Sequence, residues 1–118
     1  SSDVCSSDLD SSTNVCSDSN FDPTGDGNKI GIGKFLKFTL AAATNVTFKA
    51  TKTSGAGADP DMDLYGAGFI NTGDSSVANT ETFTETNLPA GTYVLEVYEY
   101  KNTTTTPAGK TCFKVDFQ

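Results

Sequence analysis

The chain of 118 residues contains no histidine, no arginine and no tryptophan. Without histidine, the Ser-His-Asp and Cys-His nucleophile pairs and imidazole metal sites are excluded. Without arginine, the bidentate fork that favours phosphate and carboxylate ligands is absent. The 15 Asp and Glu residues outnumber the 8 lysines, and a formal net charge of -7 argues against nucleic acids and anionic membranes as partners. No apolar run approaches the roughly 20 residues that cross a bilayer, so we expect no membrane insertion.

Threonine, glycine, serine and asparagine are abundant instead. Hydrophobic residues make up 36% of the chain, which is less than in an average globular domain. No segment is charged enough to be plainly disordered. This composition is typical of a small extracellular β domain, and the length corresponds to one domain.

The first nine residues, Ser1 to Leu9, resemble the conceptual translation of a common sequencing-library adapter, as found in metagenomic fragments. A native serine-rich linker is the alternative. We interpret residues 1–9 as non-native and exclude them from fold reasoning. We expect the native N-terminus, with any signal peptide or upstream catalytic domain, to lie outside this sequence. Residues 10–28 are polar and include a Pro/Gly turn cluster, which indicates a linker or lead-in loop, and we expect the domain itself at 29–118.

Three cysteines are present. Setting Cys5 aside leaves Cys16 and Cys112, one near each end of the remaining chain. Even numbers of cysteines in secreted-type sequences usually pair. We therefore predict a Cys16–Cys112 disulfide with Cα atoms within about 7 Å, and a secreted protein, extracellular or periplasmic. Two unrelated thiols are the alternative.

Alternation of apolar and polar residues with a period of two dominates the chain after residue 33, and no stretch shows a helical period. Short strands separated by turn signals predict an all-β fold, a single-domain antiparallel two-sheet β-sandwich of the jelly-roll or immunoglobulin-like kind. The predicted strands are 34–40, 45–52, 61–65, 80–86, 92–100 and 111–117. The predicted core comprises Leu36, Phe38, Leu40, Val46, Phe48, Leu64, Phe83, Leu88, Tyr93, Leu95, Val97, Phe113, Val115 and Phe117.

Three spaced segments resemble strands of the bacterial pre-peptidase C-terminal domain. They are FLKFTL at Phe35–Leu40, DMDLY at Asp61–Tyr65 and LPAGTYVLEVY at Leu88–Tyr98, and the last is the most specific. Their order and spacing match, and the resemblance covers roughly 29–117. It implies a β-sandwich with a non-catalytic accessory role beside secreted peptidases and other hydrolases. The chain departs from the family pattern in the Gly66-Ala-Gly68 interruption and in its terminal cysteine pair.

Some relatives of this family in collagenases bind calcium and collagen. In this chain Asp59, Asp61 and Asp63 alternate along a predicted strand, so their side chains share a face at a spacing of about 7 Å. With Asp22 and Asp26 of the turn cluster they form a candidate calcium site, because calcium binds several carboxylate and carbonyl oxygens. The alternative is that these aspartates solvate a strand end and cap turns. No other cofactor is indicated.

The tyrosines Tyr65, Tyr98 and Tyr100 are candidates for a surface that binds a sugar or a polypeptide. Ordinary cross-strand packing is the alternative for these rings.

No nucleophile–base pair or deep-pocket motif is visible, so we predict that the domain is not an enzyme. The leading hypothesis is a non-catalytic accessory module of a secreted bacterial hydrolase, preferably a peptidase, that aids substrate binding, secretion or stability. Its expected partners are a parent catalytic domain upstream and an extracellular protein or polysaccharide substrate. The alternative is a structural or adhesive β-sandwich domain of a larger cell-surface protein.

Overall fold

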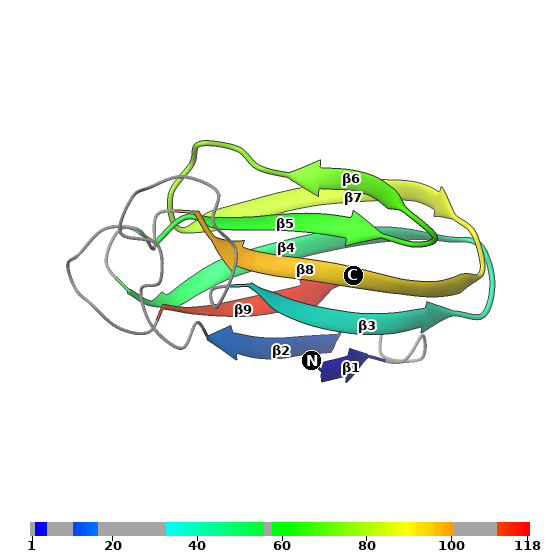
Figure 1. Cartoon of the computed structure of the whole chain (residues 1–118), viewed down its shortest axis with the longest axis horizontal. Helices are drawn as coiled ribbons and strands as arrows, with labels where there is room; N and C mark the ends of the chain where they lie inside the picture. The colour runs from blue at the N-terminus through cyan, green and yellow to red at the C-terminus, as the bar shows by residue number, and fades with distance from the viewer. Residues whose placement is uncertain (1, 5–10, 17–32, 56–57, 101–110) are drawn as a thin grey trace.

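The computed structural model describes residues 2–4, 11–16, 33–55, 58–100 and 111–118. Every regular element in these residues is a β-strand (Figure 1). The strands are β1 (Ser2–Val4), β2 (Ser11–Cys16), β3 (Lys34–Leu40), β4 (Thr44–Ser54), β5 (Pro60–Tyr65), β6 (Phe69–Gly73), β7 (Thr80–Leu88), β8 (Gly91–Glu99) and β9 (Cys112–Phe117).

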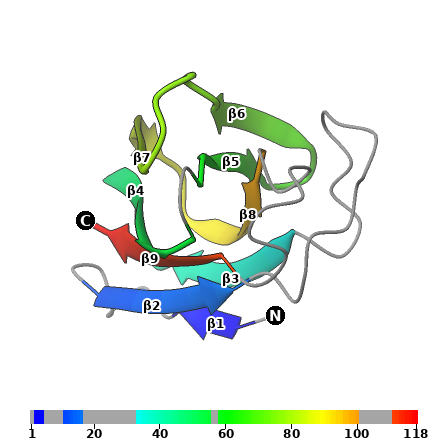
Figure 2. The same cartoon turned by 90° about the vertical axis from the view of Figure 1, so that its left-hand side faces the viewer.

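The strands form two sheets that pack face to face, as the view along the long axis shows (Figure 2). Sheet A has the strand order β1-β3-β8-β5-β6, and sheet B has the order β2-β9-β4-β7. Neighbouring strands run antiparallel, except that β1 pairs in parallel with β3. The predicted single-domain β-sandwich is therefore confirmed.

The N-terminal part of the chain differs from the sequence prediction. Residues 10–28 read as a linker or lead-in loop, but β2 pairs with β9 over its full length of 6 residues. The loop interpretation is wrong for β2. Its polar side chains favour a loop, but backbone hydrogen bonds to β9 hold the segment in an extended conformation. The backbone of β1, within the segment expected to be non-native, lies along β3. An open sheet edge offers backbone partners to any extended chain, whatever its sequence.

A further strand, β6, was not predicted. The sequence shows no alternation after Gly68, yet Phe69–Gly73 pairs with β5 at the edge of sheet A. The Gly66-Ala-Gly68 interruption forms the turn between them, and the Gly66 N–H donates to the Gly68 carbonyl at 2.9 Å. The register of the β5–β6 ladder shifts between Leu64 and Tyr65. The glycines thus turn the strand back on itself.

The core lies between the sheets and is centred on three phenylalanines. Phe38 comes from sheet A, whereas Phe48 and Phe117 come from sheet B, and each pair of rings has centroids 5.3 to 5.6 Å apart. All predicted core residues are buried except Phe83, which is half-buried against the core. The core also contains four buried residues outside the predicted set, namely Val15, Ala50, Ala58 and Met62.

The β6–β7 connection joins the two sheets at one side of the sandwich. Asn71 on β6 donates its side-chain N–H to the Glu85 carboxylate on β7. Glu81, also on β7, is buried and accepts the backbone N–H of Ser75 in the connecting loop. These bonds hold β6 and the loop that follows it against β7.

Candidate functional site

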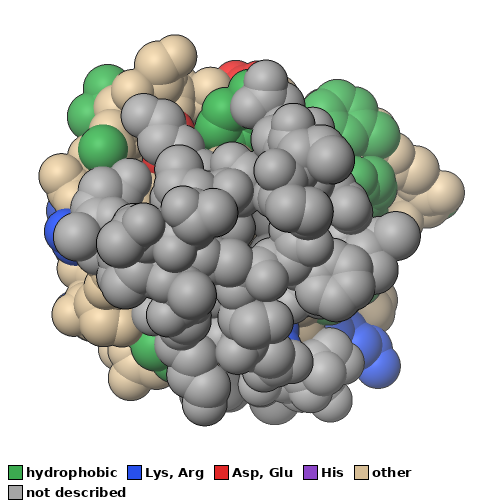
Figure 3. Space-filling view, turned by 60° about the vertical axis from the view of Figure 1, so that its left-hand side comes forward, with side chains coloured by type: hydrophobic (Ala, Val, Ile, Leu, Met, Phe, Trp, Pro, Cys, Tyr) green, Lys and Arg blue, Asp and Glu red, His purple; other side chains and the backbone are tan. Residues whose placement is uncertain are grey.

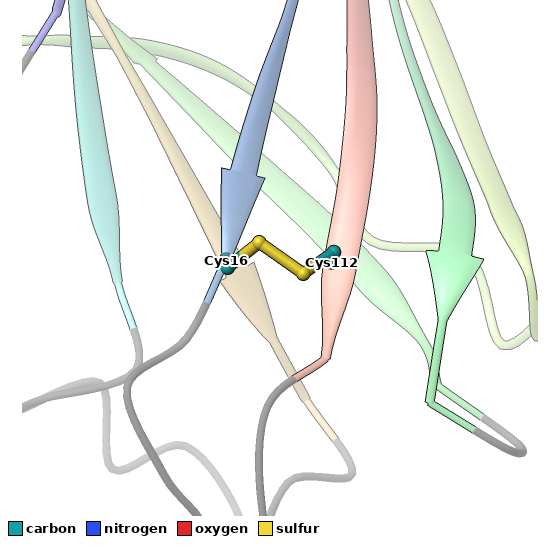
Figure 4. The surroundings of a disulfide bond; sticks show 2 residues. All are labelled: Cys16 and Cys112. Carbon is teal, nitrogen blue, oxygen red and sulfur yellow. A yellow bond between two sulfur atoms is a disulfide. The ribbon is translucent and has the colours of Figure 1, made fainter.

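The predicted disulfide is present between Cys16 and Cys112 (Figure 4). The two residues face each other at the ends of β2 and β9, and their Cα atoms are 4.1 Å apart. The bridge spans 96 residues of sequence, so it ties the first strand of sheet B to the last strand of the chain. The prediction of a Cα separation within about 7 Å is confirmed.

A pocket of about 240 Å³ lies on the face of sheet A that points away from the core. It lies where β5 begins and β8 ends, at the left-hand end of the sandwich in Figure 1. We call it the acidic pocket. The loop after β6 completes it. In the space-filling view turned toward this end, small areas of acidic side chain (red) show near the upper edge (Figure 3). Its lining residues are Asp59, Asp61, Asp74, Ser75, Ser76, Tyr98 and Tyr100.

Strand register explains why these side chains meet. Asp61 on β5 is paired directly with Tyr98 on β8, and the alternation of each strand sends their neighbours Met62 and Val97 into the core. The backbone N–H of Asp59 donates to both carboxylate oxygens of Glu99, at 2.9 and 3.0 Å. This buried carboxylate holds the lead into β5 against the end of β8.

Asp61 is the most unusual residue of the acidic pocket. Its side chain is only 4% exposed, and its Oδ1 atom has no hydrogen-bond partner among the described residues. Burial, followed by the charges of four nearby carboxylates, raises the pKa of Asp61 from 3.8 to about 7. In order of effect, those carboxylates belong to Asp59, Glu81, Asp74 and Asp63.

Tyr98 shares this environment. It is 7% exposed, and burial together with the charge of Asp61 raises its pKa above the usual range, so the phenol stays neutral. The pocket thus combines carboxylates with two phenol rings. Such a lining repels anions and attracts cations.

The aspartates of the candidate calcium site are only partly brought together. Asp59 and Asp61 line the acidic pocket, whereas Asp63 accepts a hydrogen bond of 2.6 Å from the Thr72 hydroxyl. Asp22 and Asp26 lie outside the described residues. Within the described part of the chain, no group of three or more Asp, Glu, His or Cys side chains is arranged to hold a metal ion. Calcium binding stays a prediction.

The three candidate tyrosines divide between two places. Tyr98 and Tyr100 line the acidic pocket, whereas Tyr65 lies at the other end of β5, where its ring packs edge-on against that of Phe69 with centroids 5.9 Å apart. Tyr98 is buried, so the three rings do not form one exposed strip. Sequence reasoning missed Asp74, because only the β6–β7 loop carries it to β5.

Exposed hydrophobic side chains lie outside the acidic pocket. Phe69 is 60% exposed and Val77 is 57% exposed, while Phe35 and Ile70 are also exposed. Among the described residues, no helix has the length and apolar character of a membrane span.

No protein-family model and no curated protein matches this chain. Solved structures do match it. The pre-peptidase C-terminal domain of collagenase from Bacillus anthracis has a TM-score of 0.68 at 15% identity, with 100% of this chain and 95% of that chain covered.

Two copper-binding proteins are also similar to this chain. The secreted protein MopE from Methylococcus capsulatus has a TM-score of 0.61 at 12% identity, over 97% of this chain and 87% of that one. The surface-associated protein CorA from Methylomicrobium album BG8 has a TM-score of 0.59 at 12% identity, over 91% and 93%. At these identities the likeness concerns the fold. This chain has the fold of a pre-peptidase C-terminal domain.

Proposed function

We propose that this domain is a non-catalytic accessory module of a secreted hydrolase, preferably a peptidase, and that it holds the enzyme to a protein substrate. The observation that carries the proposal is the match over the whole chain to the collagenase domain. The three resembling segments lie on β3, on β5, and on the turn into β8 together with most of β8 itself. In sheet A, β8 lies between β3 and β5. They therefore belong to one structural unit.

The chemistry of the chain supports a binding role over a catalytic one. Histidine is absent from the sequence, and Cys16 and Cys112 are joined in a disulfide. A free thiolate from either cysteine is thereby removed as a nucleophile. The acidic pocket offers carboxylates and phenols, which suit recognition of a cationic group.

The disulfide supports placement outside the cytoplasm, in a periplasm or beyond the cell, because disulfides persist in oxidising compartments. The fold also occurs in a secreted and a surface-associated protein. Both facts agree with a module that works with a secreted enzyme.

The test is co-sedimentation of the purified chain with insoluble particles. The protein particles are fibrous collagen, elastin and casein, and the polysaccharide particles are cellulose and chitin. We expect retention on a protein particle and no hydrolysis of peptide or glycoside substrates. Retention on polysaccharide alone, or on none of the particles, would contradict the proposal. Hydrolysis of a peptide or glycoside by the purified chain that is lost in Asp61→Asn would also contradict the proposal, because the domain would then be catalytic.

A structural or adhesive role is favoured by a different observation, the exposed Phe69, Ile70 and Val77 after β5. Such side chains can pack against a neighbouring domain. Recovery of the adjoining coding sequence distinguishes the two roles, since a peptidase motif supports the accessory module and further β-sandwich repeats support the structural tile.

A further inference from the structure

The acidic pocket contains a buried carboxyl group, Asp61, that is not fully hydrogen-bonded by the described part of the chain. Oδ1 of Asp61 is buried without a hydrogen-bond partner among the described residues, although the side chain lines a pocket of about 240 Å³. Leaving a buried polar atom without a hydrogen-bond partner destabilises the folded state, and more so if the group is charged. A donor supplied from outside the domain would remove that cost.

The charge around Asp61 decides the sign of that donor. Asp59 precedes it on the lead into β5, and Asp74 comes from the loop after β6, so carboxylates surround the pocket from two elements. The described lining contains no lysine. Among the described lining residues, an incoming cation would meet carboxylates from two elements and no positively charged side chain.

The size and lining of the pocket favour an organic cation over a bare metal ion. A volume of about 240 Å³ is several times the roughly 30 Å³ that one water molecule fills in the liquid. It is below the roughly 300 to 1,000 Å³ of sites for drug-sized ligands. A single amino-acid side chain suits it. Tyr98 and Tyr100 add rings against which an aliphatic stem can pack, whereas a metal ion would gain little from such rings.

We propose that the acidic pocket binds a primary alkylammonium group, namely the side chain of a lysine on a partner polypeptide, with the Asp61 carboxylate as its charge partner. An ammonium group carries three donors that point in different directions. Asp59, Asp61 and Asp74 come from two elements, and Ser75 and Ser76, which also line the pocket, carry hydroxyls that can accept hydrogen bonds. The planar guanidinium of arginine instead favours a single carboxylate that accepts two parallel hydrogen bonds. The arrangement of this pocket therefore suits lysine better than arginine.

The identity of the partner as a protein substrate rests on the proposed function, but the ammonium site itself does not. Asp74, Ser75 and Ser76 are exposed, so the pocket reaches the surface where an extended polypeptide can place a side chain in it. A polypeptide substrate bound there would hold the domain through a lysine side chain seated in the acidic pocket.

The experiment is a titration followed by two-dimensional NMR, using N-acetyl-lysine-N-methylamide as the probe. The norleucine analogue has the same stem without the charge, and the arginine analogue and calcium chloride are the competing cations. We expect shifts at residues of the acidic pocket with the lysine probe and none with norleucine. A buried charged hydrogen bond contributes about 1.5 to 3 kcal/mol, so Asp61→Asn should weaken binding about tenfold or more.

Two further variants make the result interpretable. Asp74→Asn alters an exposed loop residue, so it should fold and weaken binding by less than Asp61→Asn does. Asp116→Asn removes a carboxylate from β9 in sheet B and should leave binding unchanged.

Four outcomes would overturn the inference. They are equal binding of the norleucine and lysine probes, tighter binding of the arginine probe, binding of calcium without binding of the lysine probe, and no binding of any probe. Particle retention with a failed lysine titration would leave the proposed function standing and reject this site. A successful titration without particle retention would do the reverse.

Discussion

Asp61 on β5 and Tyr98 on β8 lie directly opposite each other in the ladder of sheet A, on the face away from the core. Both side chains are almost fully buried, and the pKa of each is raised, mainly because burial disfavours the ionised form. The acidic pocket therefore changes its charge near neutral pH through Asp61, while the phenol of Tyr98 stays protonated. A cation bound beside this pair would favour the ionised carboxylate.

The first prediction concerns the pH dependence of stability. The pKa of Asp61 is about 7 in the folded state against an ordinary 3.8. A raised carboxyl pKa means that the folded state binds the proton more tightly than the unfolded chain does. Its contribution to the free energy of unfolding is therefore fully present below pH 3.8 and is lost as the pH rises through about 7.

The measurement is urea denaturation of the parent and Asp61→Asn between about pH 4 and pH 8. One pKa unit corresponds to about 1.4 kcal/mol, so the difference between the two proteins should change by about 2 to 4 kcal/mol over this range. Asp116→Asn should follow the parent. Parallel curves for the parent and Asp61→Asn would show that Asp61 does not titrate as described.

The second prediction concerns the bridge between Cys16 and Cys112. It closes a loop with a sequence separation of 96 residues, and in the chain-entropy model such a loop stabilises the fold by about 4 to 5 kcal/mol. We expect the Cys16→Ser/Cys112→Ser double variant to melt at least about 10 °C below the parent. Cys5→Ser, which leaves the bridge intact, should melt with the parent, and a double variant that did so as well would contradict the prediction.

The third prediction concerns the centre of the core. Phe48 is fully buried and its ring lies near those of Phe38, Phe83 and Phe117. Phe48→Ala should lower the free energy of unfolding by about 3 to 5 kcal/mol, because it removes the ring and leaves a cavity. Phe35 is 47% exposed, so Phe35→Ala is the control and should cost about 1 kcal/mol or less. Similar losses in the two variants would argue against this packing.

The fourth prediction concerns the close approach of β6 to β7. A Cβ atom built on Gly73 would lie 2.8 Å from Cδ1 of Phe83 and 3.0 Å from Cγ of Glu81. Gly73→Ala should therefore destabilise the protein by about 1 to 3 kcal/mol through overpacking. A Cβ on Gly68 would meet nothing within 4 Å. Thermal melting of Gly68→Ala provides the comparison, and a Gly73→Ala variant as stable as Gly68→Ala would refute the crowding.

The strands with regular alternation could be predicted from the sequence, because side-chain periodicity reports burial directly. Leu36, Phe38 and Leu40 are one such set. The strands that alternation did not indicate, β2 and β6, are formed by pairing with β9 and β5. Their side chains carry little pattern, since an edge strand needs only one buried face and backbone partners on one side.

The candidate site was predictable only in part, for a related reason. The spacing of Asp59, Asp61 and Asp63 placed them on one strand face, but it could not show that Thr72 binds Asp63 or that Asp61 is buried. Those differences come from neighbours that are distant in sequence. The candidate tyrosines also lie apart. Tyr98 is paired with Asp61 near the start of β5, whereas Tyr65 is the last residue of that strand.

The sequence by itself determined the all-β class, most of the core and the anionic character of the protein. It predicted the pairing of Cys16 with Cys112, which the structure confirmed. Composition and period-two alternation are local properties that survive any arrangement of the strands. Only the tertiary structure decided which carboxylates meet, because β5, β8 and the loop after β6 come together through hydrogen bonding across the sheet. Burial and mutual repulsion then raise the pKa of Asp61, and both depend on distances in space that no spacing along the chain specifies.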